Sequence, residues 1–393
     1  MIINLQTSLE YNKYKSKSVV YSKELNESIK SFIPGQWCNL LFKNGEKKIA
    51  IINNQVIQGP VIRFINCFES YQNEIDFISA LIKIAINKRN MLYPNSCSRR
   101  LIYGDSDNMP GVIVDQFENC ILLQINSAGF DLYRDFIKEE LSSLLNSDVY
   151  FYDNQNYRKN EGLPNFKIPK IPDNIKVIEN KISYIIPSEN IQKIGYYFDH
   201  RENREKLKNK LGQYDTSNIQ NALDLFCYSG SWGLNALSVL NKDVTMEFVD
   251  QGDFCELINS SIKENGYLSK YSFTRSDVFK FLDHTKTKYQ LIISDPPAFS
   301  KRIENRKQAL VGYRKLINKV LNVTDKKCFW ALGSCTHGIS FEDLDGIVNE
   351  VKVKYNRKVQ MLDIGIQGGD HPFSSLRDNN FYIKYILYYV EEI

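Results

Sequence analysis

The sequence lacks the features that mark membrane, secreted and metal-binding proteins. No apolar run approaches the roughly 18 residues that a membrane-spanning helix needs, and the N-terminus is too polar for a signal peptide. The 8 cysteines are scattered without any Cys-x-x-Cys pair, so neither a zinc cluster nor a disulfide framework is indicated. We therefore expect a cytoplasmic protein with reduced thiols, no bound metal and no membrane partner.

The chain also lacks internal repeats and low-complexity tracts, and its composition is that of a globular protein. With 393 residues it is long enough for two or three domains. The net charge of +4 is uneven, because residues 1–68 hold nine Lys and Arg against four Glu, a net +5 that leaves −1 for the rest. A basic first module suggests a polyanionic partner with phosphate groups, although a solvated lysine-rich face explains the charge equally well.

The first 175 residues predict two small domains. Residues 17–68 alternate polar breaks with short apolar runs and carry the hairpin signal Asn44-Gly45. This pattern predicts that residues 1–68 form a β-rich barrel or sandwich with strands at residues 19–21, 38–42, 49–52, 55–57 and 61–64. Residues 69–175 predict a central α+β domain. Its helices fall at residues 69–93 and 130–145 and its strands between 99 and 125 and at 149–152, and residues 154–174 are expected to be a loop.

Residues 176–393 alternate strands with helices. A hairpin is predicted at residues 177–186, and a helix that opens within residues 192–204 runs to about residue 211. Strands follow at residues 221–227, 244–249, 271–274, 290–294, 328–332, 359–365 and 381–390, separated by helices at 234–240, 254–265, 278–282, 304–321 and 341–355. This alternation predicts an α/β fold, a Rossmann-like domain with a seven-stranded sheet.

Residues 224–233, Asp-Leu-Phe-Cys-Tyr-Ser-Gly-Ser-Trp-Gly, form a candidate nucleoside-binding loop between a strand and a helix. Gly230 and Gly233 let the backbone approach a ligand, and Asp250 at the end of the next strand can accept hydrogen bonds from ribose hydroxyls. The loop has neither a full Gly-x-Gly-x-x-Gly nor a Gly-Lys-Ser/Thr, which argues against NAD and ATP. S-adenosylmethionine, an adenosine without phosphates, fits; a simple tight turn is an equally weighted alternative.

Two further polar segments flank this loop in the predicted fold. Asp199, Arg201 and Asn203 follow aromatic residues and could hold a cofactor's carboxylate and ring, or could belong to a charged surface helix. Asp277 follows the third strand, where it could accept a hydrogen bond from an adenine amino group or could cap the next helix.

Two motifs carry the chemistry of the predicted site. In Asp295-Pro296-Pro297-Ala298-Phe299 the prolines fix an extended turn that exposes the aspartate at the pocket rim. Cys335 closes the following strand, where a thiolate could add to carbon 6 of a pyrimidine and make carbon 5 nucleophilic. The alternative is an inert, buried cysteine at a strand end.

Together these segments resemble the bacterial 23S ribosomal RNA 5-methylcytosine methyltransferase family of the large-subunit methyltransferase I type. The resemblance is carried by residues 103–115, 195–204, 224–233, 295–299, 312–315 and 334–336. It implies an N-terminal PUA domain, a central α+β domain and a class I methyltransferase domain at residues 176–393. It also implies ribosomal RNA as the partner, S-adenosylmethionine as the cofactor and Cys335 as the nucleophile, with Asp295 beside it. The implied cofactor contacts are Tyr196, Asp199, Arg201, Asn203, Asp224, Phe226, Tyr228, Gly230, Asp250, Asp277 and Asp295.

The chain departs from that family in two places. Residues 1–68 match a PUA domain only in size, β content and charge. Ala298 stands where many RNA 5-methylcytosine enzymes have a second cysteine, so Asp295, His337 and a bound water are all candidates for the base that removes the carbon 5 proton. Two other functions stay open at this stage: RNA methylation on a guanine or adenine nitrogen, and RNA binding by a noncatalytic ribosome-assembly factor. The resemblance also allows a homodimer.

Overall fold

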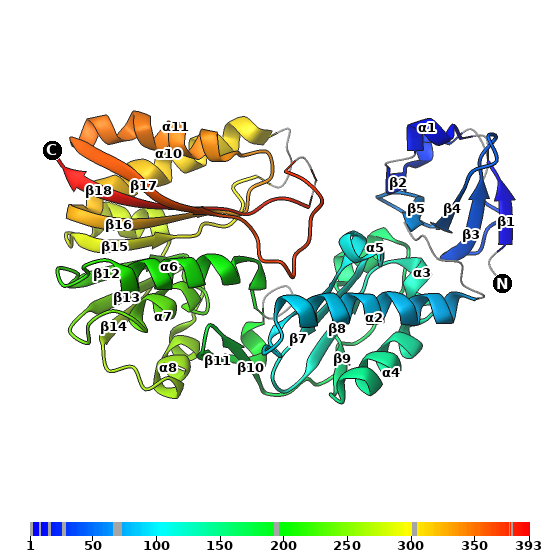
Figure 1. The fold of residues 1–393 in the computed structure, drawn as a ribbon, viewed down its shortest axis with the longest axis horizontal. Helices are drawn as coiled ribbons and strands as arrows, with labels where there is room; N and C mark the ends of the chain where they lie inside the picture. The colour runs from blue at the N-terminus through cyan, green and yellow to red at the C-terminus, as the bar shows by residue number, and fades with distance from the viewer. Residues whose placement is uncertain are drawn as a thin grey trace. The chain divides into compact units, whose positions relative to one another are not determined.

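The chain divides into two compact units. The computed structural model describes all residues except 1–2, 8, 15–16, 26–28, 66–72, 192–195, 301–304, 377 and 379. Unit 1 contains Met1–Ile175, Ile191–Gly195 and Gly369–Pro372, and unit 2 contains Lys176–Asn190, Tyr196–Gly368 and Phe373–Ile393. The domain borders expected after residues 68 and 175 stay predictions. Figure 1 shows the elements in sequence colours.

The N-terminal part of unit 1 forms a five-stranded sheet in the order β1-β3-β4-β5-β2. Its strands are β1 Ile3–Gln6, β2 Val19–Val20, β3 Gln36–Leu41, β4 Lys47–Ile52 and β5 Ile62–Ile65. The predicted hairpin joins β3 and β4, and Gly45 has φ +86° in its turn. The sequence missed β1, which pairs in parallel with β3. The strand expected at residues 55–57 is wrong, because Asn53 Oδ1 accepts the Gln55 N–H and turns the backbone away from the sheet.

The central part of unit 1 is a four-stranded sheet, β6-β7-β8-β9, packed against helices. Its strands are β6 Arg99–Tyr103, β7 Val112–Gln116, β8 Ile121–Ile125 and β9 Val149–Phe151, and its helices are α2 Glu74–Leu92, α3 Ala128–Asp131, α4 Arg134–Leu145 and α5 Gln155–Asn160. The expected start of α2 at residue 69 lies outside the described residues. The prediction of a loop at 154–174 is wrong for α5, whose first amides donate to Asn154 Oδ1 and whose buried Arg158 pairs with Asp131.

The two sheets of unit 1 share one hydrophobic core. Trp37 on β3 and Ile51 on β4 belong to the same buried cluster as Phe77 on α2. Trp37 Nε1 donates to the Gly129 carbonyl at 3.0 Å, and a Cβ at Gly129 would lie 2.5 Å from Ile51 Cγ2. The β-rich part and the central part are therefore packed as tightly as one domain.

Unit 2 contains the seven-stranded sheet, in the order β14-β13-β12-β15-β16-β18-β17. The strands are β12 Asn221–Leu225, β13 Thr245–Asp250, β14 Lys270–Arg275, β15 Tyr289–Ser294, β16 Thr324–Ser334, β17 Arg357–Gly365 and β18 Lys384–Glu392. The first five are mutually parallel, and β18 is antiparallel to β16 and β17. The predicted Rossmann-like α/β architecture with a seven-stranded sheet is confirmed.

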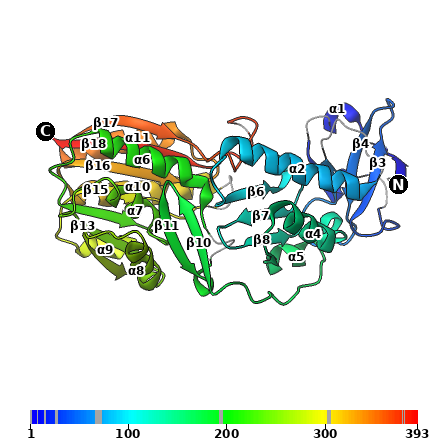
Figure 2. The same cartoon turned by 60° about the horizontal axis from the view of Figure 1, so that its bottom comes forward.

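Helices cover both faces of this sheet (Figures 1 and 2). They are α6 Arg201–Gln213, α7 Ser231–Leu237, α8 Cys255–Glu264, α9 Val278–His284, α10 Arg306–Val323 and α11 Phe341–Val351. One face packs against α9, α10 and α11, and the opposite face carries α6 and α7, with α8 against the hairpin of β10 Asn174–Glu179 and β11 Ile182–Pro187. The predicted hairpin at 177–186 is thus confirmed.

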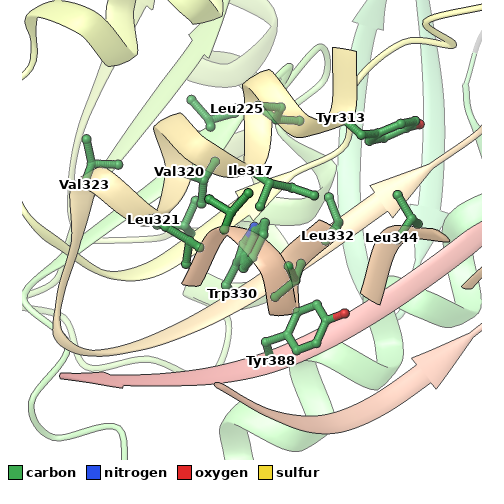
Figure 3. Packing of buried hydrophobic residues seen from close by; sticks show 14 of the residues in the cluster. Leu225, Tyr313, Ile317, Val320, Leu321, Val323, Trp330, Leu332, Leu344 and Tyr388 are labelled. Atoms are coloured by element: carbon green, nitrogen blue, oxygen red, sulfur yellow. The ribbon is translucent and has the colours of Figure 1, made fainter. Parts of the chain in front are cut away.

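A packed aromatic and aliphatic cluster holds the centre of the sheet in place. Figure 3 shows Trp330 of β16 and Tyr388 of β18 between Leu321 of α10 and Leu344 of α11. Trp330 Nε1 also donates to Ser294 Oγ on the neighbouring strand at 2.9 Å. Each fully buried side chain of this kind contributes roughly 1.5–3 kcal/mol. The cluster makes β15 and β16 rigid supports for the loops at their carboxyl ends.

Candidate active site

The loops that follow β12, β13, β15 and β16 lie along one edge of the sheet. Leu225 at the end of β12 is in register with Val249 of β13 on one side and with Ser294 of β15 on the other. Ser294 is in turn in register with Leu332 of β16. Because the carboxyl ends of parallel strands meet at this edge, it is where an open α/β sheet binds its ligands.

The loop after β12 has a strained backbone. Phe226, Tyr228 and Gly230 have φ values of 60°, 42° and 67°, in the left-handed region that non-glycine residues rarely adopt. This geometry ends the strand at Leu225, two residues before the predicted end, and α7 begins directly after Gly230. Such strain costs of order 1–3 kcal/mol per residue and is concentrated at functional sites.

Asp224 places a buried carboxyl beneath this loop. Its Oδ2 accepts the Gly233 N–H at 2.8 Å, while its buried Oδ1 has no hydrogen-bond partner among the described residues. Burial raises the pKa of Asp224 to about 8. A Cβ at Gly233 would lie 2.4 Å from Phe248 Cε1, so the glycine is what lets α7 approach the sheet this closely.

Asp250 fixes the neighbouring loop. Its two oxygens accept backbone N–H groups from Tyr228 at 3.0 Å and from Gly252 at 2.9 Å. The Tyr228 hydroxyl donates to the Asn190 carbonyl at 3.1 Å, which ties the loop after β12 to the segment that follows β11. A carboxylate has about four lone-pair sites, so Asp250 keeps capacity for a ligand's hydroxyls.

Asp277 is the N-cap of α9. Its Oδ1 accepts the Lys280 N–H at 2.9 Å, so the helix-capping interpretation of this residue is confirmed. Phe226 lies near the same helix, with its ring 6.4 Å from that of Phe279. An adenine contact by the half-buried Asp277 stays a prediction.

Tyr196 lies in the interior of unit 2 and supports the site from below. Its hydroxyl donates to Glu179 Oε1 at 3.1 Å, and Arg204 binds both oxygens of Glu179 at 2.6 and 2.8 Å. The charge of Glu179 raises the pKa of Arg204, against the opposing effect of burial. Tyr196 is only 3% exposed, so the geometry gives it a supporting position rather than a place on the surface of the pocket.

Asp199, Arg201 and Asn203 are buried at the start of α6. Asp199 Oδ2 accepts the Tyr382 hydroxyl at 2.8 Å, and the Arg201 guanidinium lies over the Phe198 ring at 5.8 Å. Asn203 Nδ2 lies 3.1 Å from His200 Nδ1. These side chains position the start of α6 beside the carboxyl edge of the sheet. The cofactor contacts that the sequence suggested for them stay predictions.

Asp295, at the end of β15, accepts a hydrogen bond from Trp232 and lies near the His200 ring. Trp232 Nε1 donates to its Oδ2 at 3.0 Å, and His200 Nε2 lies 3.4 Å from its Oδ1. A Cβ at Gly333 would lie 2.5 Å from Asp295 Oδ1, so this glycine of β16 makes room for the carboxylate. The sequence singled out neither His200 nor Trp232, although both lie inside the quoted motifs.

Cys335 faces the Asp-Pro-Pro turn. Its half-exposed thiol lies 3.6 Å from the Pro296 carbonyl oxygen. The Tyr313 hydroxyl donates to Ser334 Oγ at 2.7 Å and contacts Thr336 Oγ1 at 2.9 Å, and Thr336 Oγ1 accepts the Phe299 N–H at 3.2 Å. A hydrogen-bond network thus joins the two predicted catalytic motifs.

Tyr197, which the sequence did not single out, marks the centre of the site. Burial, followed by the charges of Asp199, Cys335, Asp295 and Asp250 in that order, raises the pKa of its hydroxyl to about 12. The ring also contacts the Tyr228 ring, 5.4 Å away. Charges from four separate segments therefore act on one phenol, which indicates that the predicted catalytic and cofactor residues lie near one another.

The described part of the chain has neither a metal-binding cluster nor a membrane-spanning helix. No group of three or more His, Cys, Asp and Glu side chains in the described ranges could hold a metal ion. Within the same ranges, no helix has the length and apolar character needed to cross a membrane. The cytoplasmic location and the homodimer stay predictions.

Sequence comparison finds curated relatives of similar length. No model of a protein family matches the chain. Proteins named Ribosomal RNA large subunit methyltransferase I are similar to it: that of Aliivibrio fischeri is 28% identical over 302 residues, covering 72% of both chains. That of Klebsiella pneumoniae is 28% identical over 73% of this chain and 72% of its own. That of Pseudoalteromonas atlantica is 29% identical over 72% of both.

Solved structures with this fold cover nearly the whole chain. A candidate SAM-dependent methyltransferase from Streptococcus mutans has a TM-score of 0.73 at 18% identity and covers 99% of this chain and 100% of its own. A candidate methyltransferase complexed with SAH has a TM-score of 0.75 at 17% identity with the same coverage. The chain therefore has the fold of class I methyltransferases and resembles the large-subunit ribosomal RNA methyltransferase I proteins, as its motifs predicted.

Proposed function

We propose that this protein transfers a methyl group from S-adenosylmethionine to carbon 5 of a cytosine in large-subunit ribosomal RNA. The names of the curated relatives support a ribosomal RNA substrate, and the similar structure complexed with SAH supports the cofactor. The observation that carries the choice of carbon 5 is the position of Cys335, whose thiol lies against the Asp295-Pro296 turn at the carboxyl edge of the sheet.

The loops after β12 and β13 fit the cofactor. Asp224 Oδ1 is a buried acceptor without a hydrogen-bond partner among the described residues, and Asp250 has lone pairs left beside its two backbone hydrogen bonds. Gly230, with φ 67°, allows the tight turn into α7, where a Cβ would lie 3.0 Å from Leu234 Cδ1 and 3.1 Å from Phe248 Cε1. We infer that these residues hold the adenosine and amino acid parts. When bound, S-adenosylmethionine supplies an electrophilic methyl group.

Cys335 makes carbon 5 of the cytosine reactive. Its thiolate forms a bond to carbon 6, and the electron pair of the carbon 5–carbon 6 double bond becomes available at carbon 5 to bond the methyl group. A base then takes the proton from carbon 5. The electrons of the carbon 5–hydrogen bond re-form the carbon 5–carbon 6 double bond. The sulfur–carbon 6 bond breaks at the same time, and its electron pair returns to sulfur. The target cytosine must leave the stacked nucleobases of the RNA to reach the thiol, so a looped or single-stranded RNA segment is the expected target.

Two side chains near Cys335 can take the carbon 5 proton. Asp295 is oriented by Trp232 and lies across the turn from the thiol. Burial, with a smaller effect from Lys384, lowers the pKa of His337, so its imidazole is neutral at pH 7 and able to accept a proton. Of the two, Asp295 belongs to the turn that the Cys335 thiol contacts, and Trp232 Nε1 fixes its carboxyl group at 3.0 Å. We therefore assign the base to Asp295 and keep His337 as the residue to compare.

The proposed chemistry predicts a trapped covalent complex. In large-subunit ribosomal RNA that contains 5-azacytidine, ring position 5 carries no proton to remove, so methylation leaves the RNA attached to Cys335. We expect a slow-migrating adduct for the wild type and none for Cys335→Ala, while Cys97→Ala, which removes an exposed thiol, keeps it. Methyl transfer that survives Cys335→Ala would instead support methylation on a nitrogen. Cofactor binding without transfer to any RNA would support a noncatalytic binding factor.

A further inference from the structure

Lys384 is a buried lysine beside the strand end that carries Cys335. It is the first residue of β18 and lies in register with Ser334 of the antiparallel strand β16. Its exposed fraction is 3%, although lysine is among the residues least often buried. Burying an ammonium group is costly, so its presence here needs a physical explanation.

The contacts of Lys384 aim its ammonium group at the backbone next to Cys335. Nζ donates to the Thr336 carbonyl at 3.2 Å and to the Tyr382 carbonyl at 3.1 Å. Both acceptors are neutral, and no carboxylate in the described part of the chain forms an ion pair with Nζ. Nζ also lies over the Phe381 ring, 5.2 Å from its centroid. None of these partners carries a negative charge, so the field of the ammonium group acts on the residues around Thr336.

Several titratable groups lie near Lys384 and Cys335. Around Lys384 they are Cys335, Asp343 of α11 and His337 of the loop after β16. Around Cys335 they are Lys384, Tyr313 of α10, Tyr197 and Asp295. Burial lowers the pKa of Lys384 to about 8, and Cys335 is the largest influence in the opposite direction, followed by Asp343. Lys384 is thus a cation below pH 8 and interacts with the Cys335 charge more than with any carboxylate.

We propose that Lys384 is a positioning residue that favours the thiolate form of Cys335 and fixes the backbone on which it is presented. This role rests on the proposed function, in which the thiolate of Cys335 is the nucleophile. The hydrogen bonds to Thr336 and Tyr382 hold the end of β16 against β18. The ammonium charge lowers the energy of the neighbouring thiolate, because an opposite charge favours the ionised form.

The charge of Lys384 determines how the ionisation of the Cys335 thiol depends on pH. Below about pH 8 the lysine is protonated, so the Cys335 thiol loses its proton at a lower pH than it would beside a neutral side chain. Removal of the charge by Lys384→Met therefore reduces the thiolate fraction at pH 7. At high pH both proteins hold a fully formed thiolate, and the difference disappears. A shift of one pKa unit corresponds to about a tenfold change in thiolate fraction well below the pKa.

The test is the pH profile of Cys335 alkylation by iodoacetamide, followed by peptide mass spectrometry between about pH 6 and pH 10. We expect alkylation about tenfold slower in Lys384→Met at pH 7, converging with the wild type near pH 10, and a partial return in Lys384→Arg. Lys326→Met, which removes an exposed lysine near the start of β16, should leave the profile unchanged. Identical profiles for the wild type and Lys384→Met would overturn the proposal.

A second variant keeps the test decisive if Lys384→Met fails to fold. Lys384→Gln removes the charge but keeps a side-chain donor for the Thr336 and Tyr382 carbonyls, so its alkylation at pH 7 should also be about tenfold slower than that of the wild type. A profile for Lys384→Gln identical to that of the wild type contradicts the proposal. Alkylation uses neither cofactor nor RNA. If alkylation is slower in Lys384→Met but methyl transfer survives Cys335→Ala, the proposed function is rejected and the role of Lys384 stands. If alkylation is unchanged in Lys384→Met but Cys335→Ala loses the RNA adduct, only the role of Lys384 is rejected.

Discussion

At the scale of single residues, Asp224 links protein stability to the proposed cofactor site. Its pKa in the folded chain is raised by burial to about 8, above the ordinary aspartate value of about 3.9. An acid with a raised folded pKa destabilises the protein above its unfolded pKa, so the unliganded protein should lose stability as the pH rises from about 4 to 8.

Asp224→Asn should remove that pH dependence. We expect the variant to be more stable than the unliganded wild type at pH 7 by on the order of 2 kcal/mol, and to bind S-adenosylmethionine more weakly. Urea unfolding at several pH values and calorimetric titration measure the two effects. Asp173→Asn, at an exposed surface position, is the matched control. Equal stability and affinity in Asp224→Asn and the wild type would contradict this account.

Two substitutions of Asp277 separate its role as the N-cap of α9 from its proposed role in cofactor binding. Asp277→Ala should destabilise the protein by about 0.5–2 kcal/mol, because the Lys280 N–H loses its acceptor. Asp277→Ser restores a cap but no carboxylate. Recovered stability with weakened S-adenosylmethionine binding would establish both roles, whereas full affinity in Asp277→Ser would leave only the cap.

At the scale of elements, the distance between α7 and the sheet depends on one glycine. Gly233→Ala would place a Cβ 2.4 Å from Phe248 and 3.0 Å from Asp224 Oδ2, so we expect a loss of about 1–3 kcal/mol from overpacking and weaker cofactor binding. Gly346→Ala is the control: this glycine of α11 has nothing within 4 Å of a new Cβ, and alanine there should stabilise the helix. Thermal denaturation with and without cofactor compares them. A stabilised Gly233→Ala would refute the packing argument.

The elements themselves were largely predictable from the sequence. Period and length identified the seven strands and the helices of unit 2, because buried parallel strands and amphipathic helices alternate there. Strand β1 and helix α5 were missed. A short strand at a sheet edge has little periodicity, and α5 is polar because its stability comes from the buried Arg158 rather than from an apolar face.

The site was predictable only in part, for a related reason. Asp224, Asp250, Asp295 and Cys335 end strands or follow them, so the order of the strands along the chain already places them at one edge of the sheet. The supporting side chains were not recognised, because their roles come from contacts between distant segments: His200 and Trp232 with Asp295, Glu179 with Arg204, and Lys384 with the Thr336 carbonyl.

At the scale of the whole molecule, the shared core of unit 1 predicts joint unfolding of its two sheets. Trp37→Ala removes a buried ring that packs against Phe77 and Phe130, so we expect a loss of about 3–5 kcal/mol. Hydrogen exchange should then show lost protection in both β4 and β7. Lost protection confined to β4 would instead show that residues 3–65 fold independently, as the domain border predicted after residue 68 requires.

The measurement that tests the central claim most directly is the identity of the methylated nucleoside. Large-subunit ribosomal RNA that lacks the modification would be incubated with the protein and S-adenosylmethionine carrying a deuterated methyl group, then digested to nucleosides for mass spectrometry. The account predicts the label in 5-methylcytidine, with none transferred by Cys335→Ala. Label in an N-methylated guanosine or adenosine would contradict it.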